Sequence, residues 1–391
     1  MIYNFFKNKS LSCEKLLGIF FILFLFYYLI NFDLFNKLSS NDYLKGFKPE
    51  GIVIINQILN FELNKVNYFD THLIVKLITG FLQKITSNEL SFSITSNLLN
   101  MILLFLSMYF FLKSINYEYS NIMIIIFLLI FFSYKANWIW CFRKLPDIYF
   151  LFNFSLIFYF VSKSLNTNKT YYILIALFFS IISMFVRPQG IINLGFVIIC
   201  LFYLSYKKID ILKLVSILAV LYIISYPFLV YILTRFDGIN IFQNALQLIQ
   251  SGQIYYDVYY TQNDFYNQFS ISDNIISETL YYYSLFFKKL IYQLTFIRES
   301  YSFNHNLFLI FYLFTIYILI IFFFNELLEK YKNFLQLTYI ISILSLLFHS
   351  SIFIGGEPNR YQLFHLTPLY LLVSLSFVSS FEKFLEHLDR R

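Results

Sequence analysis

The chain has 391 residues, of which 59% are hydrophobic, 23% aromatic and only 13% charged, and its mean hydropathy is +0.66. A water-soluble domain cannot bury so large a share of apolar side chains, so the composition excludes that class and predicts an all-α protein that crosses a membrane many times. The net charge of +7 gives no reason to expect a nucleic-acid partner, because basic residues beside apolar spans are what orients a membrane protein. The three cysteines lack paired spacing, which argues against a disulfide framework.

The first apolar run follows three lysines and resembles a signal peptide. The residues after Ile30 read Asn31-Phe32-Asp33 and offer no small-residue cleavage site. We therefore expect a retained first helix.

Ten runs are apolar enough for bilayer-spanning helices, which need about 20 residues. They lie at 16–32, 93–113, 121–134, 148–163, 171–187, 190–206, 214–233, 306–324, 334–354 and 363–380. The third run is short and is open to extension over 135–140. Two long polar segments, 33–92 and 234–305, lie between the runs, and neither has the composition of a linker. The chain 1–391 is therefore predicted to be a single membrane-embedded domain.

Orientation follows from the lysines and arginines of the short loops, which concentrate on the cytoplasmic side of a membrane. If the N-terminus is cytoplasmic, that side holds most of them, including Lys207, Lys208 and Lys330. This bias predicts a multi-pass protein of the cell membrane with both termini in the cytoplasm. The segments 33–92 and 234–305 are then the first and second long external loops.

Both long loops contain segments that favour helices lying in the membrane interface. The stretch 275–297 is apolar, but Glu278, Lys288 and Lys289 interrupt it, so an amphipathic surface helix fits better than a span. In the first loop, apolar residues recur at helical spacing around Ile52–Leu59 and Leu73–Phe81.

Two aspartates of the first long loop are candidate general bases. Asp42 comes shortly after the first span, and Asp70 follows in Tyr68-Phe69-Asp70-Thr71-His72. A carboxylate covered by amphipathic helices can have a raised pKa and accept a proton. The alternatives are a solvated loop aspartate for Asp42 and a helix cap over 71–81 for Asp70.

The loop before the fourth span reads Trp138-Ile139-Trp140-Cys141-Phe142-Arg143-Lys144-Leu145-Pro146-Asp147. Its two tryptophans are typical of interfacial anchors. Arg143 and Lys144 are suited to hold a phosphate, or else to pair with lipid headgroups. Asp147 is placed to cap the next helix.

Two further turns carry charge at the predicted external side. Arg187-Pro188-Gln189-Gly190 joins two spans, and nothing about turning requires an arginine so close to lipid. The last span is preceded by Gly355-Gly356-Glu357-Pro358-Asn359-Arg360-Tyr361, with His365 one helical turn further. A structural Glu357–Arg360 pair is the alternative here. Because these loops are independent of one another, charge gathered on one side favours a reaction site at the membrane surface.

This layout resembles the multi-spanning GT-C glycosyltransferases, including the protein O-mannosyltransferase-like and aminoarabinose-transferase-like families. The similarity rests on one N-terminal span, a long first external loop with an acidic residue, the Arg-Pro-x-Gly turn at Arg187–Gly190 and the Arg360-Tyr361 step before the last span. Those families often carry an adjacent acidic pair in the first loop, where this chain has Asp42-Tyr43.

The resemblance implies an external active site that transfers a sugar from a polyprenyl-phosphate donor to a hydroxyl of a lipid, glycan or protein acceptor. Asp42 or Asp70 would deprotonate the acceptor, and Asp147 would position a substrate. Arg143, Arg187 and Arg360 would hold the donor phosphate. A divalent metal is an open possibility, since Asp42, Asp70 and His72 have suitable ligand atoms.

Two other functions fit the same sequence. A lipid-linked glycan polymerase or ligase would use the same side and similar arginines. A transporter or flippase would need polar groups inside the spans or broken helices, and the spans offer Asn97, Asn100, Asn153 and Asn193 with the kink-forming Pro227.

Overall fold

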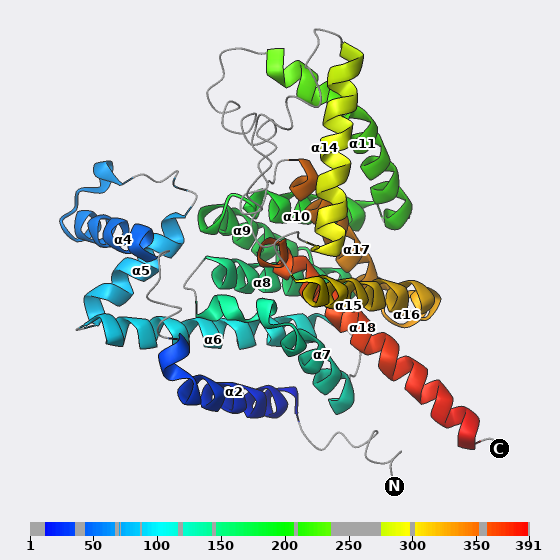
Figure 1. The fold of residues 1–391 in the computed structure, drawn as a ribbon, viewed down its shortest axis with the longest axis horizontal. Helices are drawn as coiled ribbons and strands as arrows, with labels where there is room; N and C mark the ends of the chain where they lie inside the picture. Colours follow the sequence, from blue (N-terminus) through cyan, green and yellow to red (C-terminus); the bar gives the residue numbers. More distant parts are fainter. Residues whose placement is uncertain are drawn as a thin grey trace.

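The computed structural model describes residues 12–35, 44–66, 70, 72–86, 88–115, 120–142, 146–206, 210–235, 275–297, 302–351 and 358–389. Within these ranges all regular secondary structure is helical, and apolar helices pack side by side over most of the molecule (Figure 1). The prediction of an all-α, multi-pass membrane protein is therefore confirmed.

Each of the ten predicted runs forms a helix. Their bounds are α2 Cys13–Ile30, α6 Glu89–Ser114, α7 Asn121–Ser133, α8 Asp147–Thr167, α9 Tyr171–Val186, α10 Gly190–Ser205, α11 Ile211–Arg235, α15 Phe303–Phe322, α17 Lys332–Ser351 and α18 Pro358–Asp389. A short helix, α16 Phe324–Lys330, precedes α17.

Seven of these helices, α2, α6, α8, α11, α15, α17 and α18, are long and apolar enough to cross a membrane. The α7 segment, taken with the turns after it, brings the number to eight. Helices α9 and α10 have 16 residues each, or about 24 Å at 1.5 Å per residue, which is shorter than the hydrocarbon core. That these two also span the membrane stays a prediction.

Local signals explain where several helices begin. The side chains of Ser12, Asn88, Ser120 and Ser302 each accept a hydrogen bond from a backbone N–H in the first turn, at the starts of α2, α6, α7 and α15. The Asn88 bond to the N–H of Ser91 is 2.8 Å long. Such caps satisfy N–H groups that have no partner within the helix.

The chain turns sharply after α7. Two 3-10 turns, η2 Lys135–Asn137 and η3 Ile139–Cys141, follow α7 at an angle of 95°, so an extension of the third span over 135–140 would be a sharply bent one. Asn137 stabilises the turn by donating to the carbonyl of Phe131 (2.9 Å), and Asn100 of α6 donates to the carbonyl of Cys141 (2.9 Å).

This turn places both tryptophans inside the protein. Trp138 is 8% exposed and packs edge-on against Phe24, while Trp140 is 2% exposed. The prediction that they anchor the chain at the membrane interface is therefore wrong. The reason is the bend, which folds the loop back against α2 and α6 instead of leaving it at the bundle surface.

Helices α8 and α18 form the centre of the bundle. In the apolar stretch of α18, 83% of the residues are buried inside the protein. In that of α15, only 17% are buried, so most of its apolar side chains face outward. Phe154 of α8 touches both Phe196 of α10 and Phe364 of α18. These ring contacts pack the three helices against one another.

The first long loop contains two helices, α4 Leu44–Leu59 and α5 Leu73–Ile85, with the short turn η1 Leu63–Lys65 between them. They lie together at the left of Figure 1. Their backbones cross at Gly51 and Gly80, where a Cβ on Gly80 would lie 2.3 Å from the Gly51 carbonyl oxygen. Only residues without a side chain allow so close a crossing.

The second long segment contains helix α14 Ile275–Thr295, which packs against α11 and α17. Its inner face buries Lys289 and Gln293, while Leu280 and Ile291 are each 60% exposed on the outside. An outward apolar face favours contact with lipid. The position of α14 at the membrane surface stays a prediction.

Candidate functional site

A buried ion pair joins two of the residues selected from the sequence. Arg187 Nη1 contacts Asp147 Oδ1, and their side chains are 6% and 1% exposed. Asp147 is the first residue of α8, and Arg187 ends α9. A buried charge is stable only when paired and hydrogen bonded, so this contact locks the start of α8 to the α9–α10 turn.

The Arg187–Gly190 turn is shaped for this contact. Arg187 has an extended backbone and its carbonyl accepts the N–H of Gly190 at 2.9 Å. A Cβ on Gly190 would lie 2.3 Å from backbone atoms of Ser183 and Met184. The glycine lets α10 start directly against the last turn of α9, which leaves the Arg187 side chain pointing into the bundle.

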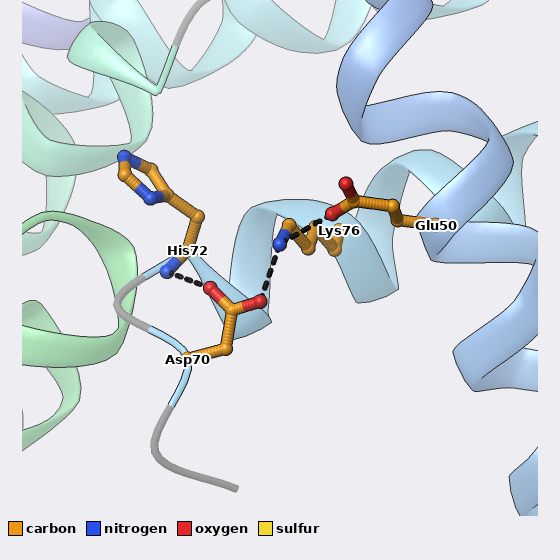
Figure 2. A network of polar contacts seen from close by, with 4 residues as sticks. All are labelled: Glu50, Asp70, His72 and Lys76. Atoms are coloured by element: carbon orange, nitrogen blue, oxygen red, sulfur yellow. Dashed lines mark hydrogen bonds and ion pairs between the residues drawn. The ribbon is translucent and has the colours of Figure 1, made fainter. Parts of the chain in front are cut away.

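The first long loop brings a second group of charges, shown in Figure 2. Lys76 of α5 contacts Asp70, and its Nζ lies 2.5 Å from Glu50 Oε2 of α4. The second oxygen of Asp70 accepts the backbone N–H of His72 at 2.8 Å. Asp70 therefore closes the turn that leads into α5 and holds Lys76 at the same time, but the N-cap of α5 is His72, so the prediction that Asp70 caps this helix is wrong.

The electrostatics of this group follow from its partners. Burial raises the pKa of Asp70, but the hydrogen bonds from Lys76 and the His72 N–H outweigh it, so the pKa lies below the usual value. Burial lowers the pKa of Lys76, yet Asp70 and Glu50 reverse the effect and raise it. Both groups are charged at neutral pH.

His72 connects the two groups of charges. Its imidazole is affected by Asp70 and Lys76 of its own segment and also by Arg187 and Asp147. Burial is the largest effect on the pKa of His72 and lowers it, and the charge of Arg187 lowers it further. Helix α5 packs against α9, which is how the first loop reaches the Arg187–Asp147 pair.

Two histidines extend the site into the bundle. His349 of α17 is fully buried, its Nδ1 lies 2.7 Å from the Ser345 carbonyl oxygen, and it interacts electrostatically with Arg187. His365 of α18 is 1% exposed and interacts with His349. The sequence places His365 near the surface turn, but the structure buries it between helices.

The structure does not describe the side chains of the other predicted site residues in the loops. Asp42, Arg143, Lys144 and Glu357 lie outside the described residues, and Arg360 and Tyr361 lie in the first turn of α18 without described side chains. The structure therefore brings Asp147, Arg187 and the Asp70 segment to one place. Within the described ranges, no three His, Cys, Asp or Glu side chains gather in a way that could hold a metal ion.

Three residues of this site, His72, Lys76 and His349, were not predicted as catalytic or substrate-binding residues from the sequence. For His72 the sequence suggested only a metal-ligand role, and for Lys76 and His349 it suggested none. An ionisable residue inside an apolar run is costly and marks function by default, so His349 carried a signal of its own. The Glu50–Lys76–Asp70 chain had no sequence signal, because it depends on the Gly51–Gly80 crossing.

The arrangement is suited to bind an anion and to move a proton. A guanidinium held by a carboxylate keeps a fixed direction, and its planar, charged group matches the geometry of phosphate oxygens. No family model, no curated protein and no solved structure matches the chain.

Proposed function

We propose that the protein is a membrane glycosyltransferase that moves a sugar from a polyprenyl-phosphate donor to an acceptor hydroxyl on the external face of the membrane. One observation carries the proposal. A buried arginine, held by Asp147 at the start of α8, lies within electrostatic reach of His72 in the first long loop. Three remote segments thus contribute a guanidinium, which we propose binds the donor phosphate, a carboxylate and an imidazole.

In the proposed reaction, the acceptor oxygen attacks the anomeric carbon and the bond from that carbon to the phosphate oxygen breaks. The bonding electrons pass to the phosphate, and the hydroxyl proton passes to a base in the first long loop. Direct displacement inverts the anomeric centre. Arg187 stabilises the charge that develops on the phosphate, since a fixed cation stabilises the transition state more than the ground state. Arg143, Lys144 and Arg360 are proposed to share this task.

The test is transfer by purified Arg187 variants, with a membrane lipid extract from cells labelled with [14C]glucose as the pool of donors. We expect Arg187→Ala to lower turnover by about a hundredfold or more, the usual cost of losing one preorganised electrostatic partner. Arg187→Lys recovers little, because an ammonium cannot reproduce a planar fork. Lys213→Ala, at a side chain 81% exposed on α11, is the matched control for loss of a positive charge. Full activity of a well-folded Arg187→Ala protein contradicts the proposal.

A transporter or flippase is the second candidate, because His349 and His365 lie fully buried inside helices that are long enough to span the membrane. Ionisable groups in such positions are typical of substrate and proton pathways. Reconstituted liposomes separate the two functions. Movement of a labelled polyprenyl-phosphate sugar across the bilayer without transfer to an acceptor favours transport, whereas transfer without net movement favours the enzyme.

A further inference from the structure

We propose that His72 is the base that takes the proton from the acceptor hydroxyl. This inference rests on the proposed function and names the group in the first long loop that performs the proton transfer.

The contacts of Asp70 leave it poorly suited to the role. Lys76 Nζ contacts Oδ2, and the backbone N–H of His72 donates to Oδ1 at 2.8 Å. Each carboxylate oxygen thus already accepts a hydrogen bond from the fold. These hydrogen bonds stabilise the ionised carboxylate and so make it a weaker proton acceptor. Asp70 instead fixes the start of α5, and with it the backbone of His72.

The His72 ring is directed toward the site. Figure 2 shows the imidazole turned away from Lys76 and Glu50. The ring is partly exposed and interacts electrostatically with Arg187 and Asp147, which belong to the α9–α10 turn and to α8. In the proposed reaction, the acceptor hydroxyl approaches the donor through this region.

The charges around His72 favour its neutral form. Asp70 and Asp147 raise its pKa, while burial, Arg187 and Lys76 lower it, and the net shift is below the usual 6.5. An imidazole that stays neutral at pH 7 can accept a proton, and catalysis is most efficient when the pKa of the base is near the working pH.

The step balances without a further reactant. The acceptor O–H bond breaks as its oxygen forms a bond to the anomeric carbon, and the proton moves to an imidazole nitrogen of His72. The bond from the anomeric carbon to the phosphate oxygen breaks, and polyprenyl phosphate leaves with the electron pair. The imidazolium then returns its proton to water at the external surface.

The first experiment compares purified His72→Gln with wild type and with the control His305→Gln, which changes a partly exposed histidine of α15. The labelled lipid extract is the donor, and both transfer and retention of labelled lipid are measured. We expect His72→Gln to lose about a hundredfold or more in transfer while it still retains labelled lipid. His305→Gln keeps wild-type transfer. Partial recovery of a His72→Ala protein by added imidazole supports a chemical role.

The second experiment measures kcat/KM against pH and does not depend on the folding of a His72 variant. The wild-type profile should fall on its acid side below pH 6.5, where His72 becomes protonated. Lys76→Met removes a positive charge that lowers the pKa of His72, so the acid limb moves to higher pH. Asp70→Asn removes a negative charge that raises this pKa, so the limb moves to lower pH.

The outcomes are distinct. If the wild-type protein transfers sugar and His72→Gln is equally active, the role of His72 is overturned and the proposed function remains in place. Loss of transfer at every pH in Asp70→Asn or Asp42→Asn, with His72→Gln active, assigns the base to that aspartate. An acid limb that does not move in Lys76→Met also contradicts the inference. If wild type transfers no sugar, the proposed function itself fails.

Discussion

Arg187 and Asp147 lie 40 positions apart in the chain and form a buried ion pair that joins the α9–α10 turn to the first turn of α8. The pair has two roles in our interpretation. It holds two helices together, and it aims a guanidinium at the site. Stability and activity therefore have to be measured separately in each variant.

We expect Arg187→Gln to lower the thermal stability of the protein, because it leaves the Asp147 carboxylate buried without the guanidinium. Breaking a buried pair by removing one partner costs about 3–5 kcal/mol. The double variant Asp147→Asn/Arg187→Gln removes both charges and should regain much of the lost Tm. Thermal unfolding in detergent, followed by size-exclusion chromatography, measures this. A Tm of Arg187→Gln equal to that of wild type would show that the pair has no stabilising role.

The Gly51–Gly80 crossing predicts a strong effect of one methyl group. A Cβ on Gly80 would lie 2.3 Å from the Gly51 carbonyl oxygen, which is backbone and cannot turn away. Gly80→Ala should separate α4 from α5 and destabilise the hairpin by about 1–3 kcal/mol, as overpacking does. It should also break the Glu50–Lys76 contact.

Two glycines provide the control for this variant. Gly18 and Gly195 lie in helices and a Cβ there meets nothing within 4 Å. Gly18→Ala and Gly195→Ala should be neutral or slightly stabilising, because alanine is the better helix former. A Gly80→Ala protein as stable as these controls would contradict the close crossing.

The Asp70 network predicts a pH-dependent contribution to stability. The folded-state pKa of Asp70 is lowered, so its contribution is present above the unfolded value of 3.8 and is lost as the pH falls through the folded value. Asp70→Asn should therefore lower the Tm at pH 7, and the difference from wild type should shrink below pH 3.8. A Tm difference that does not change between pH 7 and pH 3 argues against an ionised Asp70.

Topology is tested by labelling from outside the cell. The loop charges predict that cysteines introduced at positions 45 and 265 react with a membrane-impermeant reagent and that one at position 208 does not. The three native cysteines are buried, so the background should be low. If position 265 is protected and position 208 is labelled, the predicted orientation is reversed. The two long loops then do not both lie on the external side.

The sequence alone determined the class of the protein and the positions of its helices. Apolar runs are local signals, so each predicted run forms a helix in the structure, and seven or eight of those helices are long and apolar enough to cross a membrane. The selection of Arg187 and Asp147 also came from the sequence, because a charge at the edge of an apolar run is costly.

Only the tertiary structure decided which of these groups meet. The partner of Arg187, the burial of His365 and Trp140, and the Glu50–Lys76–Asp70 chain depend on residues far apart in sequence. Helical periodicity states which residues share a face but not which helix covers it. Close backbone approaches at Gly51, Gly80 and Gly190 fix those contacts. They bring the first long loop, α8 and the α9–α10 turn to one site.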